Sequence, residues 1–193
     1  FEDYPLEELV PYIDWTPFFI TWSLSGKYPA ILQDEVVGEA ARDLFKDAQA
    51  MLKDLIDNKR LKAQGVVGFW PAAQQNRNDV ALFEDESREQ QIARFCFLRQ
   101  QSAKANGVPN LSLADYVAPQ DAGTPDYIGG FAVTTGIGAD ELAKQYQEQN
   151  NDYNALMVKA LADRLAEAFA ELMHLRVRTE FWPYAQDESL SND

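Results

Sequence analysis

Histidine and cysteine, the usual agents of acid–base and nucleophilic chemistry near neutral pH, are scarce in this sequence. The chain contains one histidine, His174, and one cysteine, Cys96. Neither belongs to a known catalytic spacing, because the sequence lacks the GxGxxG, Walker, GxSxG and HExxH patterns. We expect Cys96 to be a buried small hydrophobic residue and His174 to lie at the surface near the end of a helix. The candidates for chemistry are therefore acidic residues.

Asp14 is the first acidic residue that could bind a small molecule. It stands between Ile13 and Trp15, in a segment over 13–29 that is rich in aromatic residues and broken by proline and glycine. Its carboxylate is either the cap of a helix, which is the commoner role, or a ligand contact in an aromatic pocket. Four tryptophans could line a ligand cage, although core packing is their more frequent use; they are Trp15, Trp22, Trp70 and Trp182.

Glu167 is the second candidate, and it belongs to a long segment whose apolar residues recur with a helical period. The predicted apolar stripe consists of Leu161, Leu165, Ala168, Phe169 and Leu172, and the opposite side carries Asp163, Glu167, Glu171 and His174. One interpretation of that side is a solvated acidic face. The alanines that flank Glu167 favour a second interpretation, because small residues permit close approach. Its carboxylate would then lie in a crevice and bind a cationic or hydroxyl-bearing ligand.

The composition restricts the class of protein. The 193 residues are 46% hydrophobic and 12% aromatic, which is enough material for a packed core. Acidic residues outnumber basic ones by 31 to 17, and the resulting charge of -14 repels nucleic acid and anionic membranes. A single cysteine excludes an internal disulfide, and a single histidine leaves little scope for a zinc site. Without a signal peptide or a membrane-spanning stretch, we expect a cytoplasmic protein.

The order of predicted elements indicates an α+β fold with a mainly antiparallel sheet, flanking helices and a long helix near the C-terminus. Helices are predicted over 5–12, 35–58, 139–149 and 152–178, and strands over 65–71, 79–86, 112–119 and 126–136. The segment 89–105 fits either a strand or a helix. Gly129 and Gly130 predict a bulge or a close backbone approach. No linker divides the chain, so we expect one domain over 1–193, truncated at its C-terminus.

Several long strings of this sequence resemble the activation domain of cobalamin-dependent methionine synthase. They are YIDWTPFFITWSLSGKYP, DEVVGEAARDLFKDAQAMLK, GVVGFWPA, FLRQQ, LADYVAP, DYIGGFAVTTG and NDYNALMVKALADRLAEAFAELMH. The resemblance extends from about residue 4 to the last residue, without a large gap. The residue pattern alone indicates an α+β domain with an acidic pocket. The resemblance adds the family to this prediction.

The resemblance implies a reactivation function. The parent methyltransferase of the family transfers a methyl group from methyltetrahydrofolate through cobalamin to homocysteine, with cobalamin and zinc in its other domains. The activation domain binds S-adenosylmethionine and docks on the cobalamin-binding domain. After one electron arrives from flavodoxin or a flavoprotein reductase, S-adenosylmethionine remethylates cob(II)alamin. This chain alone is then not catalytic, and an alternative is a docking module whose ligand site is incomplete or vestigial.

The resemblance also implies roles for two residues. The aspartate of the IDWTPFF string, here Asp14, contacts S-adenosylmethionine in the family, and the glutamate of LADRLAEAFAE, here Glu167, lies at the same site. The family's RPAPGYP motif, which supplies much of that site, is not reached by this sequence. We therefore expect weak or undetectable binding of S-adenosylmethionine by the 193-residue chain. An unrelated hydrolase that uses Asp14 and Glu167 as an acid–base pair is a remote alternative.

Overall fold

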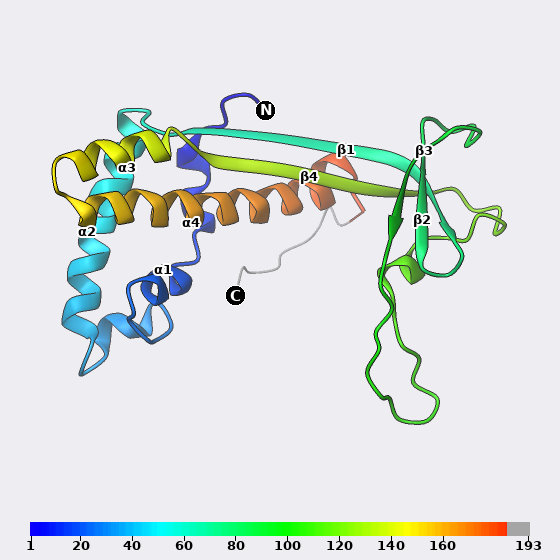
Figure 1. The fold of residues 1–193 in the computed structure, drawn as a ribbon, viewed down its shortest axis with the longest axis horizontal. Helices are drawn as coiled ribbons and strands as arrows, with labels where there is room; N and C mark the ends of the chain where they lie inside the picture. The colour runs from blue at the N-terminus through cyan, green and yellow to red at the C-terminus, as the bar shows by residue number, and fades with distance from the viewer. Residues whose placement is uncertain (185–193) are drawn as a thin grey trace. The chain divides into compact units, whose positions relative to one another are not determined.

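The computed structural model describes residues 1–184 of the chain, which form two compact units (Figure 1). Unit 1 consists of residues 1–66 together with the chain from residue 132 onward, and unit 2 consists of Val67–Phe131. The helices are α1 (Thr16–Thr21), α2 (Gly38–Asp57), α3 (Ala139–Glu148) and α4 (Asp152–Arg176). The strands are β1 (Lys62–Gln75), β2 (Asp79–Phe83), β3 (Gln91–Cys96) and β4 (Asp126–Ile137).

The four strands form one antiparallel sheet in the order β3-β2-β1-β4. The turn between β1 and β2 pairs Gln75 with Asp79, and β2 pairs with β3 from Asp79 opposite Cys96 to Phe83 opposite Gln91. A bulge between Leu82 and Phe83 interrupts the second pairing. The predicted fold class, α+β with a mainly antiparallel sheet and a long helix near the C-terminus, is confirmed.

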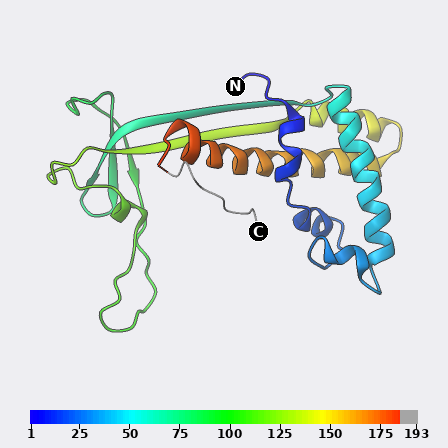
Figure 2. The ribbon, with the colours of Figure 1, turned by 180° about the vertical axis from the view of Figure 1, so that it is seen from behind.

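Helix α4 forms the centre of the core of unit 1. All five residues of its predicted apolar stripe are buried: Leu161, Leu165, Ala168, Phe169 and Leu172. The helix packs against α1, α2, α3 and the short 3₁₀ helix η2 (Val10–Tyr12), and Figure 2 shows this packing from behind. Against the strands, Thr135 of β4 donates its hydroxyl to the carbonyl of Ala162 at 2.7 Å. Burial of this stripe on a 25-residue helix contributes apolar stabilisation to the unit.

The aromatic segment after Tyr12, which contains α1, packs against α2. Trp15 is buried, and its ring meets the rings of Phe18 at 5.4 Å and Phe45 at 4.9 Å in edge-to-face geometry. Phe18 and Phe19 are completely buried. Edge-to-face contacts of this kind stabilise a core beyond the area that they bury. Trp15 therefore serves core packing, which is the commoner of the two roles considered for it.

The guanidinium of Arg99 is the centre of a hydrogen-bond network in unit 2. This group forms two hydrogen bonds of 2.6 Å to the carboxylate of Asp115, and it also donates to the carbonyls of Arg77 at 2.8 Å and Asn110 at 2.7 Å. The hydrogen bond from Arg99, assisted by one from the backbone of Ser112, lowers the pKa of Asp115 to about 2. The Arg99 guanidinium therefore connects the segment after β3 to Arg77 in the β1–β2 turn and to Asn110 and Asp115 later in the chain.

Two predicted elements are wrong in type. The predicted strand over 112–119 is the 3₁₀ helix η4 (Leu113–Tyr116), because Ser112 and Asp115 form a reciprocal capping box that begins a helix. The predicted helix over 5–12 consists of two 3₁₀ helices, η1 (Leu6–Glu8) and η2. Pro11 lacks the backbone N–H that a continuous α-helix needs at this position.

Other predictions needed adjustment or were resolved. The ambiguous segment 89–105 contains strand β3, and α4 ends earlier than residue 178 and continues as a π-helix, η5 (Val177–Phe181). Cys96 is exposed, contrary to the prediction, because β3 is the edge strand of the sheet. Gly129 is confirmed as a close approach, since a Cβ there would lie 2.9 Å from the ring of Phe69.

We expect Leu165→Ala to destabilise unit 1 by about 2–5 kcal/mol, because it leaves a cavity where the leucine is completely buried. Leu156→Ala on the same helix should cost less than about 1 kcal/mol, since Leu156 is 43% exposed. The measurement is urea unfolding followed by circular dichroism. Equal midpoints for the two variants would show that α4 does not bury the face that the structure assigns to the core.

We expect Asp115→Asn to remove part of the acid sensitivity of unit 2. The folded pKa of Asp115, about 2, lies below its ordinary value, so the Arg99 pair stabilises the fold above about pH 4 and loses its effect as the pH falls toward 2. The stabilising effect of the pair is measured by hydrogen exchange of the backbone amides of residues 97–116 at a series of pH values. An unchanged pH dependence in the variant would contradict the assignment.

Candidate functional site

Asp14 lies in the turn between η2 and α1. Its Oδ1 accepts a hydrogen bond from the backbone N–H of Thr16 at 2.9 Å, so the carboxylate caps the first turn of α1. The residue is exposed, and within residues 1–184 its second oxygen has no hydrogen-bond partner. Asp14 therefore has the capping role, and it still presents a negatively charged oxygen to solvent in a fixed orientation.

Glu167 lies on the exposed side of α4, as the helical period predicts. Its neighbours along this side, Asp163 and Glu171, are also exposed. Within the described part of the chain, the Glu167 carboxylate forms no hydrogen bond or ion pair. Ala166 and Ala170 are partly buried beside it, so the backbone of α4 is accessible to a ligand or another element at this point.

The structure places Asp14 and Glu167 in the same unit and on packed elements. Helices η2 and α1, which flank Asp14, both contact α4, which carries Glu167. Glu167 projects from helical backbone, and Asp14 lies in the short connection between two helices, which limits how far either residue can move. Both carboxylates are exposed, so solvent weakens their attraction to a positively charged group.

A cluster of side chains joins α4 to α2 and to the residue that follows α1, and no local sequence pattern predicts it. Tyr153 of α4 donates its hydroxyl to Asp47 of α2 at 2.8 Å, although the two are 106 positions apart. Its ring lies 4.9 Å from that of Trp22, just after α1, whose indole N–H is buried without an acceptor in the described residues. Unpartnered buried donors are rare in folded proteins, and this one lies at the end of the helix that Asp14 caps.

An aromatic box elsewhere in unit 1 is already filled by a cation of the chain itself. The guanidinium of Arg176, at the end of α4, lies 5.2 Å from the centre of the Phe1 ring, 6.0 Å from Tyr4 and 4.9 Å from Phe181. Arg176 also pairs with Glu180 at 2.9 Å. These rings therefore hold α4 to the N-terminal segment, and the box is closed to the cation of a ligand.

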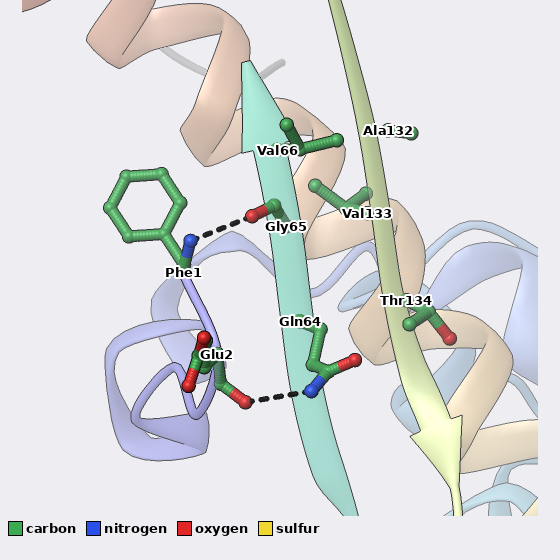
Figure 3. Close-up of a pocket in the computed structure, with 8 residues that line it drawn as sticks. All are labelled: Phe1, Glu2, Gln64, Gly65, Val66, Ala132, Val133 and Thr134. Carbon is green, nitrogen blue, oxygen red and sulfur yellow. Dashed lines mark hydrogen bonds between the residues drawn. The ribbon is translucent and has the colours of Figure 1, made fainter.

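A shallow pocket of about 610 Å³ opens beside this box, between the N-terminal segment and strands β1 and β4 (Figure 3). Its lining residues are Phe1, Glu2, Gln64, Gly65, Val66, Ala132, Val133 and Thr134. Two hydrogen bonds close one wall: the N-terminal ammonium of Phe1 donates to the Gly65 carbonyl at 2.8 Å, and the side-chain Nε2 of Gln64 donates to the Glu2 carbonyl at 3.0 Å. Neither Asp14 nor Glu167 lines this pocket, so it is not the predicted site.

The described residues contain no cluster of metal-binding side chains. Among residues 1–184, no three histidine, cysteine, aspartate or glutamate side chains come together in a way that could hold a metal ion. His174 is exposed on α4, as predicted. In this part of the chain, no helix combines the length and the apolar character needed to cross a membrane.

With this geometry established, comparison with known proteins defines the class. The sequence matches the family described as "Vitamin B12 dependent methionine synthase, activation domain" over residues 5–193. The chain therefore belongs to this family of activation domains, and the resemblance noted from its sequence strings is confirmed.

A solved structure supports the same assignment. A crystal structure of the MetH reactivation domain bound to AdoHcy is 54% identical in sequence, with a TM-score of 0.94. The similarity covers 98% of this chain and 58% of that chain. The present chain thus spans less than two thirds of the length of this relative.

We expect Asp47→Asn to lower the pKa of Tyr153. Burial, and then the hydrogen bond to Asp47, raise that pKa to about 12, and the substitution removes the negative charge that opposes ionisation. Ultraviolet titration measures it, as the difference between each protein and its Tyr153→Phe variant. Asp57→Asn, also on α2, is the control and should have no effect. A Tyr153 pKa that stays near 12 in Asp47→Asn would contradict the contact.

Proposed function

We propose that this chain is the S-adenosylmethionine-binding part of the reactivation domain of a cobalamin-dependent methionine synthase. The observation that carries the proposal is the similarity, at 54% identity, to a MetH reactivation domain bound to AdoHcy. AdoHcy is the product that remains when S-adenosylmethionine gives up its methyl group, so a site for one is a site for the other. The 193-residue chain alone would bind the ligand and transfer no methyl group.

The charges of the ligand fit the two carboxylates. S-adenosylmethionine carries an ammonium and a sulfonium group, and each is attracted to a carboxylate. Asp14 offers the oxygen that Thr16 leaves unused, and Glu167 offers its whole carboxylate from the exposed side of α4. The net charge of -14 would also increase the rate at which a cationic ligand arrives.

In the parent enzyme, cobalamin would accept the methyl group after a one-electron reduction by flavodoxin or a flavoprotein reductase. The role of this chain would be to bind S-adenosylmethionine and to orient it. Asp14 is fixed by its hydrogen bond to the α1 backbone, and Glu167 is fixed by the helix that carries it. Two anchors on packed helices would hold the ligand's amino-acid and sulfonium groups in one position while its methyl group faces the docked cobalamin-binding domain.

A docking module with a vestigial ligand site is the second candidate, and one observation bears on it. An acidic partner such as flavodoxin would need unpaired cations, yet Lys159 pairs with Asp140 at 3.1 Å and Arg164 pairs with Asp163 at 2.6 Å. Both pairs would have to open for docking through these two positions.

We expect Asp14→Asn and Glu167→Gln each to weaken binding of S-adenosylmethionine by about tenfold, the effect of losing one charge-assisted hydrogen bond. The amide oxygen of the Asp14→Asn variant can still cap Thr16, so the change removes charge and leaves the turn intact. The measurement is a nuclear magnetic resonance titration of the 193-residue chain with millimolar ligand, because micromolar affinity is not expected here. Glu171→Gln, one turn further along α4, is the matched control.

Titration with AdoHcy, which lacks the sulfonium charge, identifies the partner of each carboxylate. A variant that weakens both ligands equally has lost a contact to the ammonium group, whereas one that weakens only S-adenosylmethionine has lost a contact to the sulfonium. If both variants bind S-adenosylmethionine as tightly as the unmodified chain does, the site is elsewhere and the docking module becomes the better account.

A further inference from the structure

Tyr12, the last residue of η2, is an aromatic residue with unused surface next to Asp14. It is partly buried, whereas Ile13, which follows it, is buried. Within residues 1–184, the hydroxyl of Tyr12 forms no hydrogen bond and its ring contacts no other aromatic ring. The exposed part of this side chain is therefore free to contact a ligand.

The backbone directs Tyr12 and Asp14 to the same side of the chain. The residue between them, Ile13, has extended backbone angles, φ -71° and ψ 115°. In extended backbone, successive side chains point in opposite directions, so the residues on either side of a given one share a direction. Ile13 points into the core and Asp14 is exposed. The Tyr12 ring therefore projects on the side of the chain that also presents the Asp14 carboxylate.

This part of the chain lies against the helix that carries Glu167. Helix η2 packs against α4, and in both Figure 1 and Figure 2 the dark-blue N-terminal segment passes α4 near its middle. Glu167 belongs to the exposed side of α4. Tyr12, Asp14 and Glu167 are thus carried by one packed group of elements in unit 1.

The other aromatic rings close to Asp14 in sequence are already engaged. Trp15 is buried, and its ring meets those of Phe18 and Phe45 edge to face. Tyr28 is 36% exposed, but its ring lies 6.3 Å from that of Phe19 and 5.4 Å from that of Phe45. Among the aromatic residues of 12–28, Tyr12 is therefore the one whose ring has no aromatic partner in the described chain.

S-adenosylmethionine carries a group that carboxylates do not recognise. Its ammonium and sulfonium groups are attracted to Asp14 and Glu167, but its adenine base is planar and uncharged. Aromatic side chains bind such bases by stacking on their flat faces. We propose that Tyr12 stacks on the adenine of the ligand and so makes the site prefer an adenosyl sulfonium over other sulfonium compounds. This inference rests on the proposed function.

The first test compares two sulfonium ligands. S-methylmethionine keeps the ammonium and sulfonium groups and carries a methyl group in place of the adenosyl group. In nuclear magnetic resonance titrations of the 193-residue chain, we expect Tyr12→Leu to weaken binding of S-adenosylmethionine by about tenfold and to leave S-methylmethionine binding unchanged. Tyr12→Phe keeps the ring and should bind both ligands as the unmodified chain does. Tyr116→Leu is the control, because Tyr116 lies in unit 2 and is 74% exposed.

The second test observes the contact directly. In the unmodified chain and in Tyr12→Phe, the adenine H2 and H8 protons should show nuclear Overhauser contacts to the ring protons of residue 12. The same adenine protons should shift upfield on binding, because they lie over an aromatic ring. Tyr12→Leu should abolish the upfield shift. A residue that only supports the fold would not produce it, and the comparison between the unmodified chain and Tyr12→Phe holds even if Tyr12→Leu fails to fold.

The outcomes separate this inference from the proposed function. Absence of contacts between adenine and residue 12, or equal binding of S-adenosylmethionine by Tyr12→Leu and the unmodified chain, would overturn the stacking. The proposed function would still stand if Asp14→Asn weakens binding. Equal weakening of both sulfonium ligands by Tyr12→Leu would also overturn the stacking, because the ring would then support the fold. Adenine contacts to Tyr12 with no effect of Asp14→Asn or Glu167→Gln would keep the stacking and contradict the carboxylate contacts. No binding by the unmodified chain at millimolar ligand would contradict both.

Discussion

The burial of helix α4 is the interaction on which the candidate site depends. Leu161, Leu165 and Phe169 are completely buried, and a Cβ at Gly65 of β1 would lie 3.0 Å from the ring of Phe169. A side chain at this position would therefore require the Phe169 ring to shift. A helix anchored in this way along one side cannot rotate, so the residues on its other side, Glu167 among them, have fixed positions.

Several cations of unit 1 are engaged by other groups of the chain. Arg176 is enclosed by aromatic rings and paired with Glu180, and Lys159 is paired with Asp140. Asp14 and Glu167 keep carboxylate oxygens exposed to solvent. These carboxylates are therefore accessible to a positively charged group.

Much of this fold could be predicted from sequence because the signals are local and strong. The stripe from Leu161 to Leu172 and the side that carries Glu167 follow from a helical period sustained over many residues. The failures are also local. The capping box of Ser112 and Asp115 outweighed a strand-like pattern, and Cys96 is exposed because a residue pattern does not show which strand ends a sheet. Contacts over long separations, such as Tyr153 with Asp47, have no sequence signal at all. Asp14 and Glu167 were candidates from their local sequence, and the family resemblance assigned a ligand to them, since helical period alone does not distinguish a ligand contact from a solvated acid.

A crystal structure of this chain with AdoHcy at saturating concentration is the most direct test of the account. The proposed site predicts ligand density on the exposed side of α4, near the contact between α1 and α4. The ligand should lie within hydrogen-bond distance of the carboxylates of both Asp14 and Glu167. Density in the pocket lined by Phe1, Gly65 and Thr134, or contacts to neither carboxylate, would contradict it.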